Sequence, residues 1–268
     1  MSTATAEASS TKNPARPREF EFVLPIGYMD REGQIHRNVR IRKMTGREES
    51  ILTDKRFQRN GGRLVTELLH SCIVGLGTLT RNGTSPISGM YSVDRNFLLL
   101  KLRSITFGPE LKASYTCPTC SETTKLTEDI DELPVRSLAE GESAEEIGIQ
   151  LEDGYVDRDG QTHTTLKLRL PTGNDEEAVA SQVRQNASEG KNALLARCMK
   201  SLGDIPPHRL EAQGTHILSE LTMTDRRLID RTLSQAAPGI NLVRNIECAS
   251  CGNAFATTLD LSHFLALE

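Results

Sequence analysis

Four of the six cysteines in this chain form two Cys-x-x-Cys pairs, Cys117-Pro-Thr-Cys120 and Cys248-Ala-Ser-Cys251. Such a pair serves either disulfide exchange or zinc binding. Disulfide exchange needs the first cysteine at the start of a helix, but both pairs here lie between segments with the residue pattern of β-strands. Four thiolates complete a tetrahedral zinc site and leave no position for water. The sequence therefore predicts a structural zinc ion rather than a catalytic one.

The two pairs are separated by 127 residues, whereas the pairs of an ordinary zinc ribbon are about 15–20 residues apart. An internal repeat accounts for the difference. Residues 27–49 read GYMDREGQIHRNVRIRKMTGREE, and residues 154–176 read GYVDRDGQTHTTLKLRLPTGNDE; 11 of these 23 positions are identical. Chance would give about one or two identities. We infer that a domain has been duplicated and that each copy kept one cysteine pair.

Three arrangements of the four thiols remain open from the sequence. If the copies pack about a pseudo-twofold axis, symmetry brings both pairs together around one shared zinc ion, and we favour this arrangement. The second arrangement is an incomplete site in each copy, completed by another protomer or by a histidine. His263 follows Cys251 by 12 residues but has no counterpart in the first copy. The third is four thiols without a metal.

The same elements are expected in both copies to position the cysteines. Alternating apolar residues and a glycine-containing turn predict a β-hairpin at the start of each copy. A threonine followed three residues later by an acid then predicts a helix start, at Thr45 and at Thr172. A second helix follows a glycine-containing break, and a third begins after a loop, with Ser92 and Thr224 as expected N-caps. Gly108 and Gly239 mark the ends of the third helices, ahead of the cysteine hairpins.

These elements predict an α+β fold made of a tandem duplicated domain, in which each copy is a β-hairpin, about three helices and a zinc-knuckle hairpin. The length of 268 residues suits two domains. No apolar run is long enough for a membrane span, and the N-terminus lacks the apolar core of a signal peptide. The expected boundaries are a disordered tail at 1–18, the first repeat at 19–132, an acidic linker at 133–146 and the second repeat at 147–268.

Other chemically interesting residues favour structural roles. His36 and His163 follow the hairpin turns, and a hydrogen bond that holds each turn is the expected role. Cys72 and Cys198 occupy the apolar face of a predicted helix and are expected in the core. The basic run Arg37–Lys43 is interpreted as an exposed strand face. Motifs of hydrolases, kinases or phosphate-binding loops are absent from the sequence, which argues against an enzyme.

Several segments resemble the baseplate assembly proteins of contractile-tailed phages, the T-even-type baseplate hub family that also occurs in contractile injection systems. The resemblance covers roughly residues 20–130 and is weaker in the second copy, where TDRRLID at 224–230 stands in place of the helix motif. It rests on four segments in order: IRKMTGREESIL (41–52), SCIV (71–74), VDRNFLLLKLRSITFG (93–108) and YTCPTC (115–120). The family's knuckle cysteines match Cys117 and Cys120.

The resemblance implies a non-enzymatic component that takes part in baseplate or hub assembly in the bacterial cytoplasm, with other tail proteins as partners. Incorporation into the finished particle is left open. No membrane or small-molecule substrate is expected, and nucleic acid is not the expected partner, because the net charge is −4. The alternative is a zinc-ribbon regulator that binds nucleic acid through the basic segment Arg31–Arg63.

Overall fold

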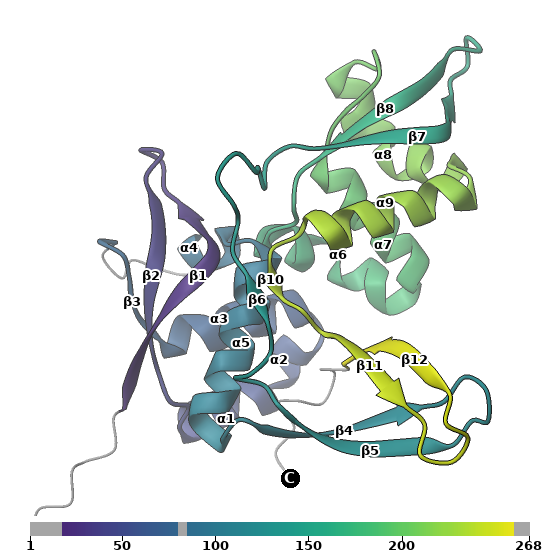
Figure 1. Cartoon of the computed structure of the whole chain (residues 1–268). Helices are drawn as coiled ribbons and strands as arrows, with labels where there is room; N and C mark the ends of the chain where they lie inside the picture. The colour runs from purple at the N-terminus through teal and green to yellow at the C-terminus, as the bar shows by residue number, and fades with distance from the viewer. Residues whose placement is uncertain (1–17, 80–84, 260–268) are drawn as a thin grey trace, which may run out of the picture.

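A computed structural model describes residues 18–79 and 85–259 of the chain. The predicted disordered tail at 1–18 lies outside the described residues except for Arg18, and so does His263. Within the described ranges the protein has a mixed α+β fold with several small sheets (Figure 1).

The N-terminal half is a three-stranded antiparallel sheet packed against helices. The strand order is β1 (Glu19–Met29), β2 (Ile35–Arg42) and β3 (Ile73–Leu76), with a bulge in β1 between Val23 and Tyr28. Apolar side chains of the sheet, such as those of Leu24 and Ile41, are fully buried against the helices. The helices are α1 (Gly46–Thr53), α2 (Lys55–Gln58), α3 (Gly61–Cys72), α4 (Ser85–Gly89) and α5 (Ser92–Phe107).

The C-terminal half has a sheet of the same order and the same antiparallel pairing. Its strands are β7 (Ile147–Val156), β8 (Thr162–Leu168) and β9 (Met199–Leu202), with a bulge in β7 between Gln150 and Tyr155. Leu166, Leu168 and Ile217 belong to its core. The helices are α6 (Gly173–Gln185), α7 (Ala187–Cys198), α8 (Pro207–Glu220) and α9 (Met223–Ala236).

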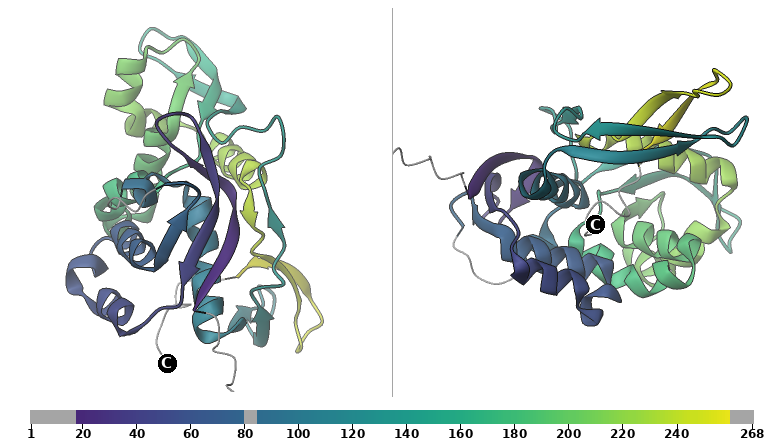
Figure 2. Two further views of the ribbon diagram at one scale, coloured as in Figure 1. Left: turned by 90° about the vertical axis from the view of Figure 1, so that its left-hand side faces the viewer. Right: turned by 90° about the horizontal axis from the view of Figure 1, so that it is seen from below.

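Two further hairpins lie side by side, away from both sheets (Figures 1 and 2). One consists of β4 (Glu110–Thr116) and β5 (Thr123–Asp129), and the other of β11 (Val243–Glu247) and β12 (Ala254–Thr258). They share a third small core with the middle of α5, in which these residues are buried: Leu100, Tyr115, Ile130, Leu133, Ile246 and Leu259. This shared core holds the two cysteine turns at the same end of the hairpins.

The segment expected as an acidic linker is held against both halves. Its strand β6 (Val135–Arg136) pairs with β10 (Gly239–Ile240), and the backbone N–H of Leu138 donates to the carbonyl of Pro25 at 2.9 Å. Ala144 is buried in the C-terminal core. The segment therefore has fixed contacts along its length.

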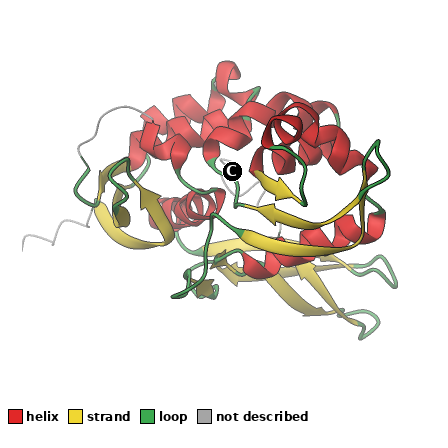
Figure 3. Cartoon of the chain, turned by 90° about the horizontal axis from the view of Figure 1, so that it is seen from above, coloured by secondary structure: helices red, strands yellow, loops and turns green. Residues whose placement is uncertain are grey.

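The two halves pack through different surfaces. Helix α6 of the C-terminal half packs on α3, α4 and α5 of the N-terminal half. A twofold axis would also place α1 on α7, but these two described helices make no comparable contact and lie far apart in Figure 1. Seen from above, most helices gather along one side of the molecule and most strands along the other (Figure 3).

The expected helix starts are confirmed at Thr45 and Thr172, which both form complete capping boxes. The other two expected N-caps are wrong. Helix α5 begins after Tyr91, because the backbone N–H of Ser92 donates to the carbonyl of Pro171 in the other half. Helix α9 is capped by Thr222, two residues before Thr224.

The third strand of each sheet and helix α8 were not predicted from the sequence. Leu202, which continues the apolar spacing of the helix before it, lies in β9. In both halves the helix that ends in a buried cysteine passes directly into the third strand, which returns the chain to the sheet.

A buried ion pair fixes the start of α1. The carboxylate of Glu48 is fully buried and accepts from both terminal nitrogens of Arg42, at 2.8 and 3.1 Å. Burial alone would raise the pKa of Glu48, but the hydrogen bonds from Arg42, Ser71 and Thr45 hold it at about 2. The expectation of an exposed Arg42 is therefore wrong, whereas Arg40 is exposed and pairs with Glu19. Arg169 and Asp175 make the corresponding pair at α6.

We expect Glu48→Gln to lower the free energy of unfolding by about 2 kcal/mol at neutral pH, because Arg42 loses its charged partner. The folded-state pKa lies below the ordinary value of 4.5. The stabilisation is therefore present above that value and disappears as the pH falls toward 2. Urea unfolding should show the gap between wild type and variant closing over this range. Glu49→Gln, at an exposed neighbouring position, is the control. A gap that stays constant with pH would contradict the assignment.

Candidate metal centre

Each Cys-x-x-Cys pair occupies the turn of a hairpin, and the two turns have the same backbone structure. In the first, the N–H of Cys117 donates to Glu122 O and the N–H of Ser121 donates to Cys117 O, both at 2.9 Å. In the second, Cys248 and Gly252 make the matching bonds, also at 2.9 Å. Ser121 and Gly252 both have positive φ, 59° and 70°. Glycine adopts a positive φ freely, whereas serine adopts it only at an energetic cost. The hydrogen bonds of the first turn therefore hold Ser121 in this conformation.

The four cysteine sulfurs converge on one point between the hairpins. The Sγ atoms of Cys117 and Cys251 are 3.7 Å apart, and those of Cys120 and Cys248 are 3.6 Å apart. All four lie within 4.8 Å of one another. A tetrahedral ion with Zn–S bonds of about 2.3 Å separates its sulfurs by about 3.8 Å. The sulfurs therefore stand at distances compatible with a zinc ion.

Backbone hydrogen bonds favour the thiolate form at the first cysteine of each pair. The N–H of Cys120 points at the sulfur of Cys117 and lowers the pKa of that thiol to about 6. The pKa of Cys120 is raised to about 12, because the neighbouring thiol of Cys251 and burial outweigh the opposing N–H of Glu122. The pKa of Cys248 is likewise lowered, first by the N–H of Cys251. A positive ion among the sulfurs would favour the thiolate form of all four cysteines, since a coordinated thiol is deprotonated.

The donor set is closed. Cys117 and Cys248 are buried, and Cys120 and Cys251 lie at the surface. Within residues 18–79 and 85–259, no other group of three or more cysteine, histidine or acidic side chains gathers in this way. An ion held by four sulfurs has no vacant position for a substrate or a water molecule, so the arrangement suits a structural role.

A polar contact between strands β5 and β11 ties the two hairpins together and could not be predicted from the sequence. Arg244 on β11 lies 3.2 Å from the carboxylate of Glu128 on β5, and the hydroxyl of Tyr115 donates to the same carboxylate at 2.8 Å. The Nδ2 atom of Asn253 approaches the sulfur of Cys117 at 3.9 Å. These contacts connect the two halves even without a metal.

The remaining candidates have the structural roles expected from the sequence. His36 contacts Asp30 of its turn at 2.7 Å, and His163 contacts Asp157 at 3.3 Å. Both histidines are buried under a glycine of positive φ, Gly77 in one half and Gly203 in the other. Cys72 and Cys198 are buried in the helices α3 and α7.

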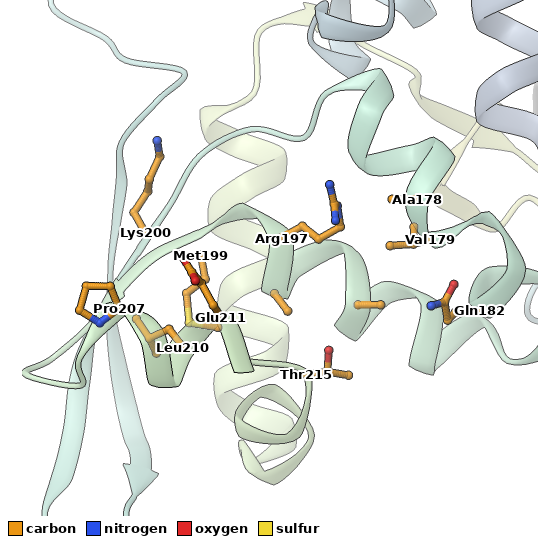
Figure 4. A pocket seen from close by; sticks show the side chains of 12 residues that line it. Ala178, Val179, Gln182, Arg197, Met199, Lys200, Pro207, Leu210, Glu211 and Thr215 are labelled. Carbon is orange, nitrogen blue, oxygen red and sulfur yellow. The ribbon is translucent and has the colours of Figure 1, made fainter. Parts of the chain in front are cut away.

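An opening between helices of the C-terminal half has no group of side chains suited to catalysis. It lies between α6, α7 and α8, has a volume of about 530 Å³ and is lined largely by small and apolar side chains (Figure 4). Its most prominent cation, Arg197, is engaged with the carboxylate of Asp175 at 3.0 Å. No nucleophile with an adjacent base lines it.

Comparison with known families decides the kind of protein. A family model described as T4 bacteriophage base plate protein matches residues 18–266, nearly the whole chain. The chain belongs to this family. The comparison with curated proteins gave no match, and neither did the comparison with solved structures. Membership supports a structural role in a phage baseplate and interaction with other tail proteins. No helix among the described residues is both long and apolar enough to cross a bilayer.

We expect the purified baseplate protein to carry one zinc ion per chain, because the four sulfurs share one centre. Native mass spectrometry measures the stoichiometry directly. Cys198→Ala, which changes a thiol in the core of α7, should keep the ion. Two ions per chain, or none, would contradict a shared site.

We further expect Cys120→Ser and Cys251→Ser to be non-additive, because one lost ligand already weakens a common ion for both halves. Urea unfolding with zinc present should give nearly the same loss for the double variant as for either single variant. Losses that add would indicate two separate sites.

Proposed function

We propose that this baseplate protein is a non-enzymatic structural or assembly component of a contractile-tail baseplate or hub, in a phage or a related injection system. It acts through contacts with other tail proteins. The family match over residues 18–266 is the observation that carries the proposal. The closed sulfur cluster supports it, because such a site stabilises a fold and offers no reactive position.

We propose that Cys117, Cys120, Cys248 and Cys251 hold one structural zinc ion. The close sulfur pairs 117–251 and 120–248 each join the first cysteine of one pair to the second cysteine of the other. The two hairpins that carry these cysteines therefore meet in an approximately symmetric way. Binding energy for such an ion becomes folding energy. The ion therefore joins the N-terminal and C-terminal halves into one rigid binding unit.

The proposal includes a duplicated domain with repeats at 19–132 and 147–268, joined by the segment 133–146. The shared sheet order and the matching bulges support the duplication. Asp94 and Asp225 support it further, because each accepts backbone N–H groups of a bulged strand, from Gly27 at 2.8 Å and from Gly154 at 2.8 Å. Two related domains give one chain two similar surfaces for tail proteins.

A nucleic-acid regulator is less well supported. Two arginines of the basic strand are occupied within the protein, Arg40 by Glu19 and Arg42 by Glu48. Only one aromatic ring, that of Phe57, lies under guanidinium groups in the segment Arg31–Arg63. Proteins that bind single strands combine cationic grooves with several stacking rings.

The test is affinity capture of the tagged protein from cells in which tails assemble in the bacterial cytoplasm, with nuclease treatment of one half of the lysate. We expect baseplate proteins to be recovered equally from both halves. Cys248→Ser combined with Cys251→Ser should reduce recovery, and Cys198→Ala is the matched control. Recovery of nucleic acid without tail proteins would overturn the proposal. Analysis of finished particles by mass spectrometry tells whether the protein stays in the virion.

A further inference from the structure

The first turn of α6 is the main bridge between the two halves. Glu176 lies 3.3 Å from Nε of the buried Arg95, and the hydroxyl of Thr66 donates to the carboxylate of Glu177. Asn60 Nδ2 donates to the backbone carbonyl of Glu177 at 2.8 Å. The helix comes so close that the guanidinium of Arg95 occupies the space where a side chain at Gly173 would lie. An acidic helix start therefore sits on an arginine-centred surface of α3 and α5.

A backbone bridge accompanies this contact. The N–H of Ser92 donates to Pro171 O at 2.8 Å, and the N–H of Gly173 donates to Met90 O at 3.0 Å. The segment before α6 thus pairs with the segment before α5. One acidic turn, one arginine and one pair of backbone bonds thus make up the contact between α6 and the N-terminal half.

The repeat provides a second acidic helix start that has no such partner. The counterpart of Gly173 and Glu176 is Gly46 and Glu49 at the start of α1. Among the described residues, no atom outside the first turns of α1 and the chain next to Gly46 lies within 4 Å of the place where a side chain at Gly46 would begin, and the carboxylate of Glu49 makes no ion pair. Phe107, with 51% of its surface exposed, lines a 140 Å³ hollow beside this turn. We call Gly46, Glu49 and Phe107 the α1 patch.

The repeat also provides a second arginine-centred surface that has no acidic turn. Arg226 is the counterpart of Arg95: its Nη1 donates to Asn192 Oδ1 at 2.6 Å and to Leu218 O at 2.9 Å, as Arg95 Nη1 donates to Thr66 and Ile87 O. No carboxylate pairs with Arg226 among the described side chains. Met223 beside it is 65% exposed, and its N–H makes no backbone bridge to any described residue like the one that Ser92 makes. We call Asn192, Met223 and Arg226 the α9 patch.

We propose that the α1 patch of one copy docks on the α9 patch of a second copy, head to tail. The two patches are complementary in charge, and each carries an exposed apolar side chain. Helices α1 and α9 lie in distant parts of the molecule (Figure 1), so the two patches meet only between chains. The inference rests on the proposed duplication, and it adds a partner, a second copy of this protein.

The contact between copies differs from the internal one at several residues: Ser50 stands where α6 has Glu177, and one further difference is steric. A side chain at Gly62 would lie 2.7 Å from the backbone N of Glu177, so α3 accepts α6 only because glycine is present there. The counterpart on α7 is Ser188. The helices must therefore cross at a greater distance between copies, and the association is weaker than the internal contact. A heterologous contact of this kind produces a ring or an open chain rather than a closed symmetric pair.

The test is sedimentation velocity of the full-length zinc-loaded protein alone, up to about 1 mM. We expect association that increases with concentration in the wild type. Glu49→Lys removes the acid of the α1 patch and Met223→Asp removes the apolar contact of the α9 patch, so each variant should need at least about tenfold higher concentration to associate. Both positions are exposed, so the fold is not at risk.

Mixing the two variants distinguishes a head-to-tail contact from a symmetric one. Glu49→Lys keeps an intact α9 patch and Met223→Asp keeps an intact α1 patch, so an equal mixture should form dimers and nothing larger. A symmetric contact would instead stop the wild type itself at dimers, whereas a head-to-tail contact lets the wild type grow beyond dimers and limits only the mixture to them. Glu140→Lys and Val156→Asp, at exposed positions outside both patches, are the controls and should behave like the wild type.

A wild type that stays monomeric over the whole range would overturn the inference, and so would variants that associate like the controls. Because no tail protein is present in this experiment, such a failure leaves the affinity capture result unaffected. Loss of tail-protein capture with intact self-association would instead remove the proposed function and keep the contact between copies.

Discussion

One carboxylate in each half determines how the strands and helices fit together. Asp94, at the start of α5, accepts the backbone N–H groups of Ile26 and Gly27 at 2.9 and 2.8 Å, where bulged strand β1 leaves them without a partner in the sheet. Burial raises the pKa of Asp94 to about 6 against the effect of these bonds. Asp225 accepts from Glu152 and Gly154 in the same way. Without the carboxylate, two buried donors would be unsatisfied and the helix would lose its place on the sheet.

The arginine that follows each aspartate extends this anchor to the other helices. Arg95 connects α5 to a side chain of α3 and to a carbonyl of α4, and Arg226 connects α9 to a side chain of α7 and to a carbonyl of α8 in the same way. The difference lies in what covers the guanidinium. Arg95 is covered by the first turn of α6, and Arg226 is partly exposed. The same Asp-Arg pair thus serves internal structure in both halves and the interface between halves in only one.

The sequence predicted the features that depend on short stretches of chain. Alternation predicted the first hairpins, and hydroxyl residues with acids three positions later predicted the starts of α1 and α6. The common location of four cysteines followed from the repeat. The start of α5 could not be predicted, because it is set by the carbonyl of Pro171, 79 residues away. Strands β3 and β9 have four residues each and follow helices directly. Their short alternation of apolar residues therefore cannot be told apart from the apolar periodicity of the preceding helix. Alternation alone predicts an exposed Arg42, because it cannot show that a buried Glu48 lies within reach of this side chain.

Two of the contacts between the halves differ in symmetry, and this difference has a consequence for the metal. The hairpins meet about the sulfurs in an approximately symmetric way, whereas α6 meets α3 without a counterpart between α1 and α7. Helix α6 lies within the stretch of chain between Cys120 and Cys248, and α3 lies outside it. An ion that joins those cysteines would close this stretch into a loop and restrict the unfolded chain. Its stabilisation would therefore extend to the α3–α6 contact, although no ligand of the ion touches either helix.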